Sequence, residues 1–301
     1  RSTLRIGSME TSELLKKVRK IEIKTRGLSR NIFAGQYHSA FKGRGMAFSE
    51  VREYQFGDDI RDIDWNVTAR YNRPYVKIFE EERELTVMLM IDVSGSKDFG
   101  SARVMKKEIM TEVAATLAFS AIQNNDKIGV IFFSDRIEKF IPPQKGKKHI
   151  LYIIRELLDF EPQNKQTDIS QALKYLTNAI KKRCTTFLIS DFIDHKSYKD
   201  ALTIANRKHD VVAIQVYDHR ETELPAIGLM KIKDAESGAE RWIDSSSAHV
   251  RKAYHDWWTK RQSEMADAFK KSRVDSVSIQ TEDDYVRALI SLFDQRNYVN
   301  K

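Results

Sequence analysis

Short apolar segments alternate along most of this chain with longer segments whose apolar residues recur at helical spacing. The strand-like segments are 85–91, 127–133, 185–189, 211–217 and 276–280, and the helix-like segments are 101–123, 148–158, 169–181, 199–208 and 285–293. Strands that alternate with helices of about 10 to 20 residues form parallel sheets with helices on both faces. The sequence therefore predicts an α/β fold built on a doubly wound, mainly parallel sheet.

Two regions depart from this alternation. Before residue 84, glycines and paired acids separate short strand-like pieces, and we expect a short helix that Asp58 or Asp59 caps and that runs through Trp65. Later, the segments 229–232 and 241–243 predict a hairpin, which a long helix over 248–271 follows with its tryptophans packed in the core. We therefore expect an N-terminal extension over 9–83 and an α/β domain over 84–301 with an insertion at 222–273.

The positive charge of the chain comes from its first residues. Residues 1–44 contain eleven Lys or Arg against three Glu, and this surplus equals the whole net charge of +8. Such an arm could meet nucleic acid or an acidic partner, but basic runs are more often solvated helix faces. We expect the solvated face and keep nucleic-acid binding as an alternative.

Composition and motifs exclude several classes of protein. The apolar run at 85–91 is far shorter than the roughly 18 residues that a membrane span needs. Cys184 is the single cysteine, so it cannot form an internal disulfide, and its apolar neighbours predict a buried, inert thiol in a cytoplasmic protein. The sequence has no Walker-type phosphate loop and suggests no Ser-His-Asp or Cys-His pairing, so we do not expect an enzyme.

Oxygen-bearing side chains follow the predicted strands at one edge of the sheet. Asp92, Ser94 and Ser96 alternate directly after the strand 85–91, Thr167 precedes the helix 169–181, and Asp191 follows the strand 185–189. Loops at the carboxyl ends of parallel strands meet in one crevice, so these side chains should lie close together. Carboxylate and hydroxyl oxygens are the ligands that Mg²⁺ or Mn²⁺ prefers. The sequence therefore predicts one divalent cation per chain.

The motifs DVSGS, QTDISQAL and LISDF resemble the metal-ion-dependent adhesion site (MIDAS) of von Willebrand factor A domains. The resemblance implies that Asp92, Ser94, Ser96 and Thr167 contact the ion directly and that Asp191 acts mainly through water. Many A domains carry methionine where this chain has Lys97, so a cation is expected close to the ion.

A second resemblance concerns the segment GRGMAFSEVREYQFGDDIRDIDWNVTAR, which is similar to the signature of the bacterial domain-of-unknown-function family 58. Members of that family are typically encoded beside MoxR-type AAA+ ATPases. Both resemblances imply a metal-dependent protein-interaction module that acts with such an ATPase as an adaptor or co-chaperone. Its partner would offer an Asp or Glu carboxylate to the ion.

The signature segment is rich in opposite charges. It holds Arg52, Glu53, Asp58, Asp59, Arg61, Asp62, Asp64 and Arg70. Neighbouring opposite charges usually pair, so we expect these residues to brace the segment against the α/β domain. Two alternatives stay open: a second interaction surface, and a metal-dependent hydrolase that uses the Asp58–Asp64 acids.

Overall fold

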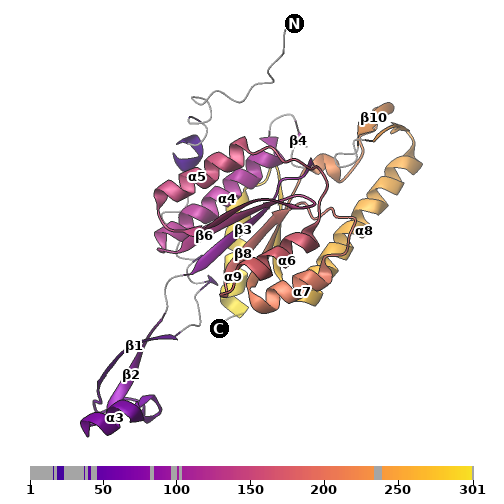
Figure 1. Ribbon diagram of the computed structural model, residues 1–301. Helices are drawn as coiled ribbons and strands as arrows, with labels where there is room; N and C mark the ends of the chain where they lie inside the picture. Colours follow the sequence, from indigo (N-terminus) through magenta and orange to yellow (C-terminus); the bar gives the residue numbers. More distant parts are fainter. Residues whose placement is uncertain are drawn as a thin grey trace.

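A six-stranded sheet forms the centre of the molecule (Figure 1). The computed structural model describes residues 16, 19–23, 37, 40–41, 46–81, 85–95, 100–101, 104–233 and 239–299. The strands are β3 (Thr86–Asp92), β6 (Lys127–Phe133), β7 (Ile137–Gln144), β8 (Thr185–Ser190), β9 (Asp210–Tyr217) and β12 (Asp275–Gln280), in the order β12-β9-β8-β3-β6-β7. Neighbouring strands are parallel except β6 and β7, which are antiparallel. The predicted α/β fold with a mainly parallel sheet is confirmed.

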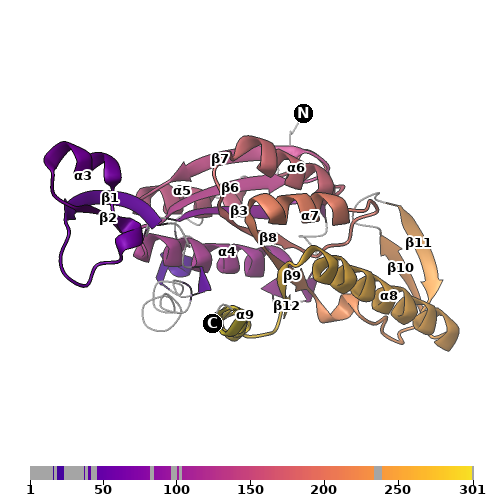
Figure 2. The ribbon, with the colours of Figure 1, turned by 90° about the horizontal axis from the view of Figure 1, so that it is seen from below.

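Helices cover both faces of this sheet. The first face carries α4 (Lys106–Gln123), α5 (Lys147–Asp159) and α9 (Tyr285–Val299), and the second carries α6 (Ile169–Ala179), α7 (Lys199–Lys208) and α8 (Ala248–Ser272). Figure 2 shows α4 and α9 on one side of the strands and α6 and α7 on the other. Alternate residues of β3 point to opposite cores, with Leu89 in the first and Met90 in the second. Burial on both faces explains why the strands are continuous apolar runs.

Aromatic residues from the N-terminal part of the chain belong to the first core. Tyr37 and Phe41 are buried against Phe187 of β8 and Phe293 of α9. The ring centroid of Phe41 lies 5.3 Å from that of Phe187 and 5.3 Å from that of Phe293, both edge to face. The guanidinium of Arg296 lies 4.5 Å above the Phe41 ring. The N-terminal segment therefore helps to build the α/β core.

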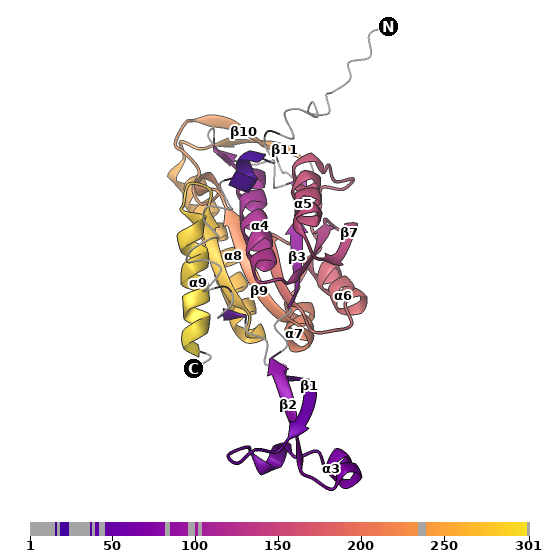
Figure 3. The same cartoon turned by 90° about the vertical axis from the view of Figure 1, so that its left-hand side faces the viewer.

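The signature segment forms a projecting structure that we call the hairpin arm, residues 46–81. In it, β1 (Met46–Glu53) pairs antiparallel with β2 (Tyr75–Glu81), and η2 (Ile60–Asp62) and α3 (Trp65–Tyr71) lie between the two strands in the sequence. Figure 3 shows the arm extending away from the sheet at the end where β3 begins. Exposed apolar side chains gather in this segment: Phe56, Ile60, Trp65 and Tyr71.

The predicted brace between this segment and the α/β domain is wrong for the side chains that the structure describes. Arg52 forms a two-pronged ion pair with Asp58 (2.6 and 2.8 Å) inside the arm. Other pairs, such as Lys77 with Asp64, are also internal, and Arg61 is exposed. The charges pair within the arm because the hairpin and its helix caps bring these partners together.

Two predicted helix starts are corrected. Asp59 caps only the short η2, whereas Asp64 accepts hydrogen bonds from the backbone N–H groups of Asn66 and Val67. Trp65 therefore begins α3 instead of ending a helix. The helix expected from residue 101 begins at Lys106, after the short antiparallel pair β4 (Gly100–Ser101) and β5 (Val104–Met105), because the backbone at Met105 is still extended.

The predicted hairpin and long helix are present in the region 222–273. Strands β10 (Leu229–Lys233) and β11 (Glu240–Asp244) pair antiparallel and precede α8, while the turn expected at 236–238 lies outside the described residues. Trp258 is buried as expected, but Trp257 is 41% exposed, so only one of the two packs fully. No helix in the described part of the chain is both long and apolar enough to cross a membrane.

Candidate functional site

Asp92 lies at the carboxyl end of the central strand β3 and is only 2% exposed. Its Oδ1 accepts a hydrogen bond from the backbone N–H of Ser94 (2.9 Å), and its Oδ2 accepts one from the hydroxyl of Ser190 (2.7 Å). Ser94 is fully buried beside it. These two bonds fix the carboxylate at the point where β3 and β8 end together.

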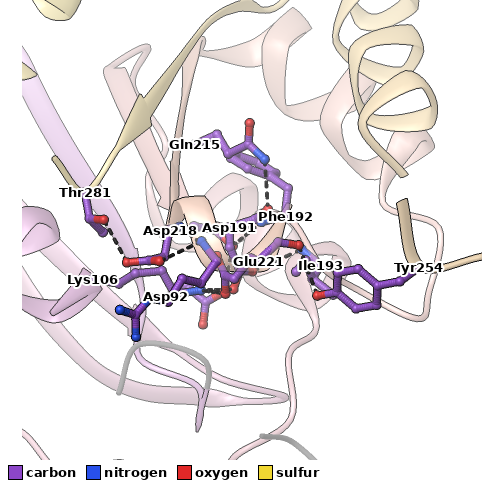
Figure 4. Close-up of polar contacts among 12 residues, drawn as sticks. Asp92, Lys106, Asp191, Phe192, Ile193, Gln215, Asp218, Glu221, Tyr254 and Thr281 are labelled. Atoms are coloured by element: carbon purple, nitrogen blue, oxygen red, sulfur yellow. Dashed lines mark hydrogen bonds and ion pairs between the residues drawn. The ribbon is translucent and has the colours of Figure 1, made fainter. Parts of the chain in front are cut away.

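Asp191 follows β8 directly and is buried at the same edge of the sheet. Its Oδ1 accepts from the backbone N–H of Ile193 (3.1 Å), and its Oδ2 lies 2.9 Å from the ammonium nitrogen of Lys106 (Figure 4). Phe192, the next residue, adopts a left-handed backbone conformation (φ 59°) and packs edge to face on Phe269 of α8. A buried aromatic residue in this conformation is strained, and the surrounding packing must hold it there.

The electrostatics of the edge disfavour the negative charge of Asp92. The pKa of Asp92 is raised to about 6, because burial and the neighbouring Asp191 carboxylate raise it by more than the hydrogen bonds from Ser190 and Ser94 lower it. The negative charge of Asp92 is therefore costly in the metal-free protein, and a cation held there would relieve that cost.

Thr167 is brought to this edge by backbone contacts of its loop. The N–H of Gly95 donates to the carbonyl of Lys165 (2.9 Å), and the N–H of Asp168 donates to the carbonyl of Ser134 after β6 (3.0 Å). Asp168 caps α6, accepting from the N–H of Gln171 (2.8 Å). The hydroxyl of Thr167 is left buried without a hydrogen-bond partner among the described residues. Buried hydroxyls are nearly always paired, so this hydroxyl is an exception that a bound ligand would explain.

The structure thus places Asp92, Ser94, Thr167 and Asp191 at one edge of the sheet. Ser96, the fifth predicted ligand, lies outside the described residues, as does Lys97. No group of three or more His, Cys, Asp or Glu side chains in the described part of the chain is arranged to hold a metal. A site of two acids and several hydroxyls differs from such a group, and the orphaned Thr167 oxygen fits a hard cation that takes hydroxyl ligands.

Sequence reasoning missed two charged members of this centre, Lys106 and Glu221. Lys106 is the first residue of α4 and is 1% exposed, and its Nζ lies 2.6 Å from Oε1 of Glu221. Glu221 ends η4 (His219–Glu221) after β9, where it forms a capping box with Asp218. A capping pair directly after a strand was the available signal for Glu221. Lys106 had none, because a lysine near a helix start usually lies in solvent.

If Asp92 holds a divalent cation, as the sequence predicts, the binding of that ion should depend steeply on pH below about 6. The folded pKa of Asp92 lies above its ordinary value, so protons compete with the ion for this carboxylate. Below pH 6 the apparent affinity for Mn²⁺ should fall by about tenfold per pH unit, and above pH 7 it should level off. Because the pKa of Asp92 is higher in the folded protein than in the unfolded chain, ionisation of Asp92 destabilises the metal-free fold as pH rises from about 4 through 6. Calorimetric titrations between pH 5 and 8 measure this, and a flat affinity would contradict it.

The acids of the hairpin arm are occupied differently. The Arg52 side chain and the N–H of Gln55 lower the pKa of Asp58, and the N–H groups of α3 lower that of Asp64. Groups with a lowered pKa are poor general acids at neutral pH. The contacts of these acids cap and brace the arm itself, and they give no support to a hydrolytic site there.

The fold and the site together define a class: an α/β protein whose mainly parallel sheet is covered on both faces and carries a buried acidic centre at its carboxyl edge. Comparison with protein families narrows this class. The family described as "Protein of unknown function DUF58" matches residues 50–264, and the chain belongs to this family. The match spans most of the hairpin arm and the strands that carry Asp92 and Asp191.

Two relatives and a solved structure are also similar to this chain. Uncharacterized protein Rv1480 of Mycobacterium tuberculosis and uncharacterized protein Mb1516 of Mycobacterium bovis are each 30% identical over 237 residues, which is 78% of this chain and 75% of theirs. The structure of an aerotolerance-related membrane protein from Bacteroides fragilis aligns with a TM-score of 0.50 at 16% identity, over 71% of this chain and 99% of that one. At that identity the likeness concerns the fold alone.

Proposed function

We propose that this chain is a cytoplasmic, metal-dependent protein-interaction module with a von Willebrand factor A-like fold. In this proposal Asp92, Ser94, Ser96 and Thr167 hold one Mg²⁺ or Mn²⁺, and Asp191 supports the ion through water. The bound ion would offer an open position to a carboxylate of another protein. We further propose, from the family resemblance, that a MoxR-type AAA+ ATPase is the partner with which the module acts as an adaptor or co-chaperone.

The orphaned hydroxyl of Thr167 is the observation that carries this proposal. A buried hydroxyl without a partner costs about 1–3 kcal/mol, and its loop is held by backbone hydrogen bonds that do not need the side chain. A hard cation beside Asp92 would supply the missing interaction. The raised pKa of Asp92 adds independent support, because a site prepared for a positive charge is unfavourable for carboxylates when that charge is absent.

Thr167 also gives the sharpest test. Thr167→Val keeps the shape of the side chain and removes only the hydroxyl, so it should weaken Mn²⁺ binding by about tenfold or more while leaving the metal-free protein as stable as before, or slightly more stable. Thr167→Ser keeps the hydroxyl and should bind Mn²⁺ nearly as the natural chain does. Isothermal titration calorimetry and thermal melting with and without Mn²⁺ measure both effects. If the valine variant binds the ion as well as the natural chain, Thr167 is not a ligand.

The same variants extend the test to the partner. The complex with the host's MoxR-type ATPase, captured by pull-down, should be lost in EDTA and weakened by Thr167→Val. EDTA and Thr167→Val together should weaken the complex little more than EDTA alone, because both remove the same interaction. A complex that forms equally in Mg²⁺ and in EDTA would show that the metal has no role in binding this partner.

A further inference from the structure

Lys106 is an unusual residue to find inside the acidic centre. Its ammonium is buried and lies 2.9 Å from Asp191 Oδ2 and 2.6 Å from Glu221 Oε1 (Figure 4). These two carboxylates come 85 and 115 residues after Lys106 in the sequence. Lys106 also begins α4, and a positive charge is unfavourable at the amino end of a helix. Burial and position both oppose a lysine here, so its two carboxylates must compensate for it.

The carboxylates around Lys106 are themselves firmly placed. The N–H of Asp218 donates to Glu221 Oε2 (2.9 Å), and the hydroxyl of Tyr254 on α8 donates to the backbone carbonyl of Glu221 (3.0 Å). Asp191 is fixed by the N–H of Ile193 on its other oxygen. Lys106 therefore contacts two carboxylates that cannot easily move toward or away from it.

The charges in this group are unequal. Asp92, Asp191 and Glu221 bring three negative charges when ionised, and Lys106 brings one positive charge, which leaves two negative charges among the four side chains. Asp218, a further buried acid, forms the capping box with Glu221, so the centre carries more acidic than basic groups. A divalent cation held at Asp92 would lie near Asp191, whose carboxylate contacts Lys106, so the two positive charges would repel each other.

We propose that Lys106 is an internal cation of this site, which pairs with Asp191 and Glu221, offsets part of their charge, keeps Asp191 from ligating the ion directly, and so limits the affinity for divalent cations. This inference rests on the proposed function only in assuming that the cation site lies at Asp92. A weakly held, incompletely neutralised ion retains more of its charge for an incoming carboxylate. Lys106 thus acts as a positioning residue that adjusts how strongly the site attracts its ligand.

Replacing Lys106 with methionine tests this directly, because methionine has a similar length and no charge. Lys106→Met in the full-length chain should bind Mn²⁺ more tightly by on the order of tenfold to a hundredfold, since a repelling charge is removed and Asp191 Oδ2 becomes available. Lys139→Met is the matched control, because Lys139 forms a similarly close pair with Glu156 (2.5 Å) on α5, away from the site. It should leave the Mn²⁺ affinity unchanged.

A charge-compensated pair of variants keeps the test valid if Lys106→Met folds poorly. Glu221→Gln removes one negative charge and should weaken Mn²⁺ binding, and adding Lys106→Met to it should restore the affinity to about that of the natural chain. If Lys106 had only a structural role, its replacement would lower stability without restoring the Mn²⁺ affinity of Glu221→Gln. Melting temperatures without metal, measured beside the titrations, separate the two effects.

The outcomes distinguish this inference from the proposed function. If the natural chain binds Mn²⁺, and Lys106→Met tightens binding neither in the natural chain nor in Glu221→Gln, the inference about Lys106 is overturned and the metal site stands. If the natural chain binds no Mn²⁺ but the lysine-free variants do, the lysine has taken the place of the ion and the proposed metal function fails. If folded variants and natural chain all fail to bind, both ideas are overturned.

Discussion

Asp92→Asn is expected to abolish divalent cation binding while leaving the metal-free protein at least as stable at pH 8 as the natural chain. The substitution removes the negative charge of the carboxylate that is proposed to ligate the ion at the end of β3. Loss of a group that merely supports a ligand costs about 10–100-fold in metal affinity, so the loss here should exceed roughly a hundredfold. The stabilisation of about 2.7 kcal/mol expected at a hundredfold excess of ion over its dissociation constant should vanish with it.

The stability of the metal-free variant follows from the same residue. The pKa of Asp92 is raised to about 6, so its charge opposes folding at pH 8, and a neutral amide of the same shape removes that opposition. Asp126→Asn is the matched control. Asp126 is equally buried, but it lies beyond the opposite end of β3, where its Oδ1 accepts from the N–H of Leu85 (2.8 Å). It should alter stability and leave Mn²⁺ binding intact; unchanged Mn²⁺ binding in Asp92→Asn would refute the assignment.

Phe41→Ala should be the most destabilising of the substitutions considered, by roughly 3–5 kcal/mol. Phe41 is 3% exposed, contacts the rings of Phe187 and Phe293, and carries the Arg296 guanidinium on its face. Truncation leaves a cavity in the first core and deprives Arg296 of its aromatic contact. Urea denaturation of the full-length chain measures the change in the free energy of unfolding.

Phe56→Ala supplies the comparison for that experiment. Phe56 is the same residue type, but it is fully exposed in the hairpin arm, so its truncation should change stability by no more than about 0.5 kcal/mol. Equal effects at the two positions would mean that the N-terminal aromatic residues do not belong to the core.

The sheet could be predicted because its signal is local. A strand that is buried on both faces must be apolar at every position, and β3, β6, β8 and β9 stand out for this reason. The candidate site followed from the same signal, since Asp92 and Asp191 come directly after two such strands and parallel strands end at one edge. Thr167 could be added because the helix α6 begins next to it.

What the sequence could not provide was the pairing of distant charges. Lys106 and Glu221 are 115 residues apart, and neither the helix start nor the loop after β9 indicates that the two meet inside the protein. The prediction for the charged residues of the hairpin arm was wrong in the opposite way. Arg52 was expected to reach the α/β domain, but it pairs with Asp58 only six residues away, because local geometry decides between equally plausible partners.

The start of α3 shows how closely such choices are balanced. Asp58, Asp59 and Asp64 all have the side chain of a helix cap, and only the hydrogen bonds that each one finds decide its role. Asp58 pairs with Arg52, whereas Asp64 directly precedes Trp65 and caps α3. The preference of aspartate for the N-cap position is the same for all three residues, so it cannot decide which of them caps α3.

The position of the hairpin arm has a consequence for how this molecule can transmit a signal. The arm extends from the end where β3 begins, whereas Asp92 ends that strand, six residues after its first residue, Thr86. Six residues of strand span about 20 Å, more than twice the screening length of roughly 8 Å at physiological ionic strength. A change of charge at Asp92 is therefore hardly felt at the arm through solvent. If the proposed ion binds at Asp92, it would therefore influence the arm mainly by mechanical means, through shifts of the strands and of the helices packed on them.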